Sequence, residues 1–95
     1  MKFTASRLSE GNKVFPAEIT LEETGLEVKI PGLFSGDTKF ISYDSISAVE
    51  VNTPMIGYST LTFFHSGNKV TAHGFTRADT ELIREEIEKR RVARK

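Results

Sequence analysis

Apolar and polar residues alternate along most of the chain, which predicts a domain built mainly from β-strands. In residues 14–22 every second position is apolar, and Leu26, Val28 and Ile30 continue the alternation after a Glu-Glu-Thr-Gly turn. A period of two is typical of strands that have one buried face. The two segments therefore predict a β-hairpin, and Gly25 is expected to supply a positive φ at its turn.

Four more strands are predicted downstream, over residues 39–43, 46–52, 60–65 and 69–75. A turn at Asp44-Ser45 separates the first two of these. Gly67-Asn68 is a favourable two-residue turn for the last hairpin. That turn would pair residue 65 with residue 70 and residue 62 with residue 73.

One helix follows the strands. Thr76 is predicted as its N-cap, and the absence of Gly and Pro afterwards allows it to span about 77–92. An apolar stripe is expected from Ala78, Leu82, Ile83 and Ile87. Two ion pairs between residues four apart are also expected, Glu85 with Lys89 and Glu86 with Arg90.

Composition limits the possible classes of protein. The 95 residues suit a single domain over 1–95, and thirteen Lys and Arg balance thirteen Asp and Glu. The chain has no Cys, which excludes disulfides and cysteine-based metal sites. The N-terminus lacks the apolar core of a secretory signal, and no apolar run is long enough to span a membrane. We therefore expect a soluble, cytoplasmic protein.

Several segments carry a family resemblance. The run Ile41-Ser42-Tyr43-Asp44-Ser45-Ile46-Ser47-Ala48-Val49-Glu50 resembles the strand–turn–strand signature of bacterial pleckstrin-homology-like (PH-like) domains of the short single-domain type. Similar segments are Ser6–Lys13 with Phe15-Pro16-Ala17, Pro31-Gly32-Leu33-Phe34-Ser35-Gly36 and Gly74-Phe75-Thr76. The resemblance implies a mainly β (α+β) fold, a bent β-barrel of about seven short antiparallel strands within 13–75, capped by one C-terminal helix. It also implies a binding or assembly module.

One departure from lipid-binding PH domains matters. Those domains hold inositol phosphates with a basic loop between their first two strands. Here the corresponding segment, Leu21-Glu22-Glu23-Thr24-Gly25, is acidic. Adjacent carboxylates would repel a polyphosphate, so no phosphoinositide site is expected.

Catalytic and cofactor-binding patterns are missing from the sequence. It contains no nucleophile elbow, no Walker A loop and no dinucleotide fingerprint. The predicted strand register puts His65 and His73 on opposite faces, where they cannot share a metal ion. We expect no catalytic residues, no metal, no cofactor, no small-molecule substrate and no enzymatic activity.

Two predicted loops carry apolar residues where turns are usually polar. One contains Leu33 and Phe34, and the other contains Met55, Ile56 and Tyr58. They are the candidate partner-binding residues, because exposed apolar patches commonly mark interaction sites. The alternative is that each loop folds back onto the sheets as a small satellite cluster.

The C-terminal residues 89–95 are strongly basic. The net charge of the chain is zero, but residues 1–50 carry −3 and residues 51–95 carry +3. The candidate anionic-surface residues are Lys89, Arg90, Arg91, Arg94 and Lys95. The alternative is that they complement the helix dipole and are otherwise solvated. No aromatic residues interleave with them, which disfavours nucleic acid.

The sequence thus favours a non-enzymatic interaction module that binds protein partners or a second copy of itself. Binding would use an open barrel edge together with the apolar loops. The alternative function is binding of an anionic membrane surface, or nucleic acid, through the basic tail.

Overall fold

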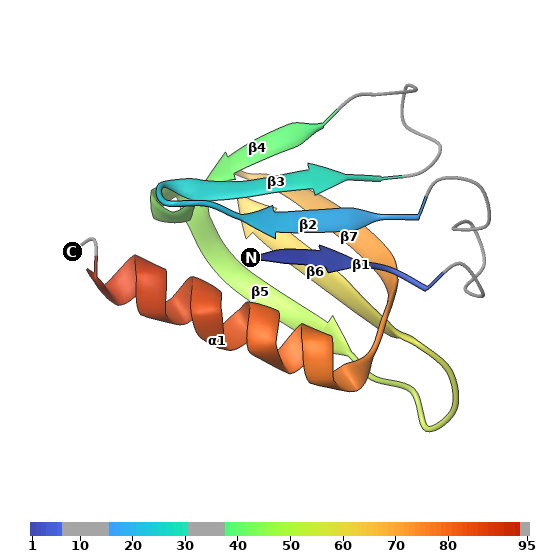
Figure 1. Cartoon of the computed structure of the whole chain (residues 1–95). Helices are drawn as coiled ribbons and strands as arrows, with labels where there is room; N and C mark the ends of the chain where they lie inside the picture. Colours follow the sequence, from blue (N-terminus) through green and yellow to red (C-terminus); the bar gives the residue numbers. More distant parts are fainter. Residues whose placement is uncertain (7–15, 31–37, 94–95) are drawn as a thin grey trace.

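The computed structural model of the chain describes residues 1–6, 16–30 and 38–93, and for the last two of these only the backbone. It is mainly β, with seven antiparallel strands in two sheets and one C-terminal helix (Figure 1). One sheet has the order β1-β2-β3-β4 and the other the order β5-β6-β7, and the two sheets are not closed into a continuous barrel. This arrangement is consistent with a PH-like fold.

The four-stranded sheet consists of β1 (Lys2–Thr4), β2 (Glu18–Leu21), β3 (Gly25–Lys29) and β4 (Lys39–Ser42). The predicted hairpin is confirmed, because Ile19 pairs with Val28 and Leu21 with Leu26. Strand β1 was not predicted. Its three residues are too few to show a period, and the pairing of Phe3 with Ile19 defines it.

The prediction that Gly25 supplies a positive φ at the turn is wrong. Gly25 lies in β3 and is not among the glycines with a positive φ. A Cβ at this position would overlap the carbonyl oxygen of Ile41 and lie 2.6 Å from Cζ of Phe40. The glycine is therefore needed for close approach of β4 rather than for the turn.

A 3₁₀ turn, η1 (Tyr43–Ser45), joins the two sheets. The second sheet consists of β5 (Ile46–Asn52), β6 (Ser59–His65) and β7 (Asn68–Phe75). Its last hairpin differs in register from the prediction, because His65 pairs with Asn68 and Thr60 with His73. The two loop residues are Ser66 and Gly67, whose φ angles of 47° and 80° suit a type I′ turn.

Helix α1 (Arg77–Ala93) begins after Thr76, whose Oγ1 accepts a hydrogen bond of 3.1 Å from the Asp79 backbone N–H. The predicted N-cap is thus confirmed. The predicted stripe is only partly right: Ile83 and Ile87 are buried, but Ala78 and Leu82 are exposed. Thr80 is fully buried instead, and its hydroxyl donates to the carbonyl of Arg77 at 2.8 Å.

The core lies between the sheets and under the helix. It contains Ile19, Leu26, Ile41, Tyr43, Leu61, Phe63, Phe75, Ile83 and Ile87, all no more than 1% exposed. The apolar face of α1 thus completes the core that the unclosed sheets leave open. Within the described part of the chain, no helix is both long and apolar enough to cross a membrane.

Candidate functional site

The β5–β6 loop, residues 53–58, carries the most exposed large apolar side chains of the described residues. Met55 is 103% exposed and Ile56 is 92% exposed, whereas Tyr58 is half-buried. The fold-back alternative is therefore wrong for Met55 and Ile56. Leu33 and Phe34 of the other candidate loop lie outside the described residues.

The loop is tied at its base rather than at its tip. Ser59 Oγ donates a 3.2 Å hydrogen bond to Thr53 Oγ1 across the two ends of the loop. Gly57 has a φ of 103°, and a Cβ added to it would meet no atom within 4 Å. The loop projects beyond the sheets, beside the start of α1 (Figure 1).

No formal charge interrupts this region. Residues 51–68 contain no Asp, Glu, Lys or Arg. An apolar partner surface could therefore cover the loop without desolvating a charged side chain within it.

The basic residues of the tail are largely engaged within the helix. Glu86 accepts from Arg90 at 2.9 Å and lies 3.5 Å from Lys89 Nζ, while Arg91 pairs with Glu88. The predicted Glu86–Arg90 pair is confirmed, but Lys89 pairs with Glu86 instead of Glu85. The hydrogen bond from Arg90 is the main reason that the pKa of Glu86 is lowered.

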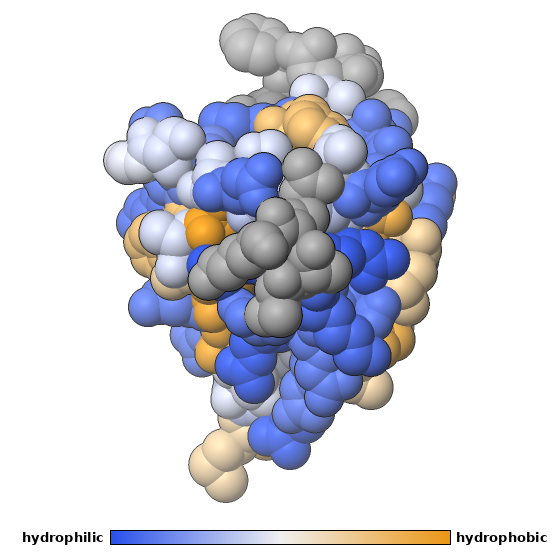
Figure 2. Space-filling view, turned by 90° about the vertical axis from the view of Figure 1, so that its left-hand side faces the viewer, coloured by the Kyte–Doolittle hydropathy of each residue, from blue (hydrophilic) through white to orange (hydrophobic). Residues whose placement is uncertain are grey.

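Arg94 and Lys95 lie outside the described residues. In the described helix five basic and five acidic residues, from Arg77 to Arg91, balance. Figure 2 shows the molecule from the end where α1 finishes, and this surface is mostly hydrophilic with small hydrophobic areas. The β5–β6 loop lies beside the start of α1 and the basic residues lie at its end, so the two are separated by about 25 Å, the length of the helix.

Tyr43 connects this end of α1 to the acidic β2–β3 turn. Its hydroxyl donates a 2.6 Å hydrogen bond to the Glu22 carbonyl oxygen, and its backbone N–H donates to the Thr24 carbonyl oxygen at 3.1 Å. Burial raises the pKa of the phenol, and the nearby charge of Arg90 opposes that effect. The acidic turn and the basic helix end thus occupy the same end of the molecule (Figure 1).

This role of Tyr43 was not predicted from the sequence, in which Tyr43 is the last residue of a predicted strand. Side-chain alternation places the residue in the core but does not indicate where its hydroxyl points. The only available signal is that a buried Tyr needs a hydrogen-bond partner.

The two histidines lie on opposite faces of the second sheet, as predicted. His65 is 8% exposed and faces the core, and its buried Nε2 has no hydrogen-bond partner among the described residues. His73 is exposed, with Nδ1 3.1 Å from Thr60 Oγ1. Among the residues with described positions, no group of three His, Asp or Glu side chains could hold a metal ion.

Comparison of the chain with protein-family models, with curated proteins and with solved structures gave no match.

Proposed function

We propose that this chain is a non-enzymatic interaction module with a PH-like architecture, and that it binds a protein partner or a second copy of itself through the β5–β6 loop. The observation that carries the proposal is the exposure of Met55 and Ile56, at 103% and 92%. Burying each of these side chains is worth about 1.5–3 kcal/mol. A partner that covers both would gain a substantial part of its binding free energy there.

Two side chains alone do not make a stable protein interface, which typically buries about 1,200–2,000 Å². Strand β5 supplies neighbouring surface, because it is an outer strand of its sheet and continues directly into the loop. An outer strand offers backbone N–H and C=O groups to an added strand. The proposed interface therefore combines strand addition at β5 with burial of Met55 and Ile56.

The PH-like assignment is supported by the order of elements along the chain. Strands β1 to β4 form one sheet, β5 to β7 form a second, and α1 completes the core. The segments that resemble bacterial PH-like domains include η1, which joins the two sheets, and β5, the first strand of the second sheet.

The alternative function, binding of an anionic surface by the tail, has less support. Lys89, Arg90 and Arg91 each pair with Glu86 or Glu88. A lipid headgroup or a nucleic-acid phosphate would have to compete with these carboxylates.

The absence of cysteine makes a direct test simple. An Ile56→Cys variant carrying an environment-sensitive fluorophore should show a blue shift when the loop is buried, and a Leu82→Cys variant labelled in the same way is the control. Leu82 is 38% exposed and lies on α1 rather than in the loop. Self-association predicts a concentration-dependent shift only at position 56. If the partner is a different protein, the fluorescence at position 56 should shift only when that protein, isolated by pull-down, is added.

Light scattering and pull-down with the Met55→Ser/Ile56→Ser double variant complete the test. Association should be lost in the double variant and kept in Leu82→Ser. A monomer at high concentration that captures no partner would contradict the proposal. Salt-sensitive binding to anionic vesicles that disappears on removal of residues 89–95 would favour the alternative function.

A further inference from the structure

The outer face of the second sheet is a regular three-by-three grid of side chains, set by the strand register. The first row is Ala48, Phe64 and Lys69, the second is Glu50, Thr62 and Thr71, and the third is Asn52, Thr60 and His73. The first row lies next to the Ser66-Gly67 turn, at the opposite end of β6 from the β5–β6 loop. The chemistry of this row differs from the other two, because it pairs an aromatic ring with a lysine.

A β-bulge interrupts the strand pairing at this row. The register of β5 against β6 shifts between Ile46 and Ala48, which leaves Ser47 out of the regular pairing. Ser47 Oγ donates a 3.2 Å hydrogen bond to the Phe64 carbonyl oxygen at this irregularity. An open pocket of about 390 Å³ lies beside the bulge, lined by Ser47, Phe64, His65, Gly67, Asn68 and Lys69.

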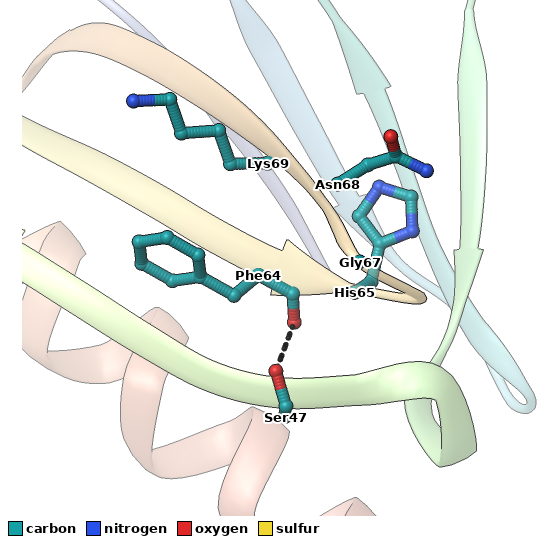
Figure 3. A pocket seen from close by; sticks show the side chains of 6 residues that line it. All are labelled: Ser47, Phe64, His65, Gly67, Asn68 and Lys69. Atoms are coloured by element: carbon teal, nitrogen blue, oxygen red, sulfur yellow. Dashed lines mark hydrogen bonds between the residues drawn. The ribbon is translucent and has the colours of Figure 1, made fainter.

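The side chains of Phe64 and Lys69 extend in the same direction from adjacent strands, as Figure 3 shows. The His65 ring lies on the other side of the hairpin, beside Asn68, and points away from them. The pocket therefore has an apolar wall from Phe64 and a cation from Lys69. The Ser47 hydroxyl is a further polar group beside Phe64. The Asn68 side chain lies with His65 on the other side of the hairpin, where its amide donates to the Ser66 carbonyl oxygen at 3.4 Å.

The charge of Lys69 is not compensated by any carboxylate that the structure describes. Lys69 is exposed and belongs to none of the ion pairs between described residues. Glu50 is the acidic residue of the grid. It lies on β5, two strands away from Lys69 on β7 and one row further along, so strand geometry separates their Cα atoms by about 12 Å. An anion entering the pocket would thus meet a lysine without first displacing a carboxylate among these residues.

We propose that this pocket binds a small organic carboxylate with a flat apolar body. The carboxylate pairs with Lys69 Nζ in a charge-assisted hydrogen bond, and the apolar body packs against the Phe64 ring. Small-ligand pockets commonly combine apolar walls with a few polar groups that fix orientation, and their volumes start at about 300 Å³. A pocket this open supports weak binding, with a Kd of about 1 mM.

Benzoate is a suitable probe, followed by amide NMR on the ¹⁵N-labelled chain. Saturable shifts are expected for Ser47, Phe64, Asn68 and Lys69, with little change in the β5–β6 loop. Benzamide has the same shape without the charge and should bind about tenfold more weakly if the Lys69 ion pair contributes. Equal affinity for the two probes, or no saturable shift with benzoate, would overturn the proposal.

Two variants localise the site. Lys69→Gln should weaken benzoate binding about tenfold and leave benzamide binding unchanged, whereas Lys39→Gln, on the other sheet, should change neither. Phe64→Leu should weaken both probes. If Lys39→Gln weakens benzoate as much as Lys69→Gln does, the binding is general attraction to positive charge and the proposal is wrong. The test is independent of Met55 and Ile56, so it can fail without affecting the proposed protein interface.

Discussion

The hydroxyl of Tyr43 donates a hydrogen bond of 2.6 Å to the carbonyl oxygen of Glu22, 21 residues earlier in the chain. Tyr43 is fully buried and is the first residue of η1, which contacts both β3 and α1. A single side chain thereby ties the first hairpin to the junction between the sheets and to the helix. This contact lies at the end of the molecule that holds both the acidic turn and the basic end of the helix (Figure 1).

Replacement of Tyr43 by Phe tests this contact. The variant keeps the buried ring but loses the hydrogen bond, so the free energy of unfolding should fall by about 0.5–1.5 kcal/mol. Urea denaturation measures the change, and Tyr58→Phe is the matched control because no hydrogen bond is described for its hydroxyl. Equal losses in the two variants would show that the Glu22 contact contributes nothing specific.

Gly25→Ala should destabilise the first sheet. The added Cβ would overlap the Ile41 carbonyl oxygen and lie 2.8 Å from Ser42 Cα, and these backbone atoms cannot rotate away. A cost of about 1–3 kcal/mol is expected, as for other overpacked positions. Thr24→Ala, at the adjacent exposed position, should cost less than about 0.5 kcal/mol. Thermal unfolding compares the two variants, and a stable Gly25→Ala variant would mean that β4 can shift freely.

The Ser66-Gly67 turn can be improved. Both residues have a positive φ, and Asn tolerates this conformation better than Ser does. Ser66→Asn should therefore raise the free energy of unfolding by about 0.5 kcal/mol, while Ser66→Val should lower it by about 1–2 kcal/mol. Chemical denaturation of both variants checks the predicted order. If Ser66→Val is as stable as Ser66→Asn, the loop does not hold this conformation.

Stability should fall in acid partly through the Lys2–Glu18 pair. Lys2 Nζ lies 2.9 Å from Glu18 Oε1, and this hydrogen bond is the main reason that the pKa of Glu18 is lowered. A lowered native pKa contributes stability above the unfolded value, near 4.5, and the contribution is lost as the pH falls through the native pKa. The pKa of Glu86 is also lowered, so its ion pair likewise contributes stability that is lost in acid.

Denaturation at pH 7 and at pH 3 measures this effect. Glu18→Gln should be less stable than the wild type at pH 7, by under about 1 kcal/mol because the pair is near the surface. The difference should shrink in acid. Glu23→Gln, in the exposed turn, is the control. A difference between wild type and Glu18→Gln that stays constant with pH would contradict the assignment to the ion pair.

Local pattern determined much of this fold. The bounds of β5 were predicted from its β-branched residues and the turn before it, and the start of α1 follows from the Thr76 cap. The faces of His65 and His73 were also predictable even though the register of their hairpin was not. A two-residue register shift preserves the face of every side chain, because the strand period is two.

Other features depended on what packs against a residue from elsewhere in the chain. Strand β1 exists because β2 pairs with it, and the need for Gly25 comes from the closeness of β4. The sequence identifies Met55 and Ile56 as apolar loop residues, but their exposure depends on which other parts of the chain pack against them. The pocket beside Lys69 was not predicted, because its lining residues come together through strand pairing and a β-bulge that the sequence pattern does not show.

The sequence by itself therefore determined the strand-rich order, the terminal helix and the faces of most side chains. These follow from interactions between residues near one another in the chain, which fix period and caps. The tertiary structure alone decided the exposure of Met55 and Ile56, the tie between Tyr43 and Glu22, and the pocket between Phe64 and Lys69. Exposure and proximity are properties of the whole packed chain, and no local pattern encodes them.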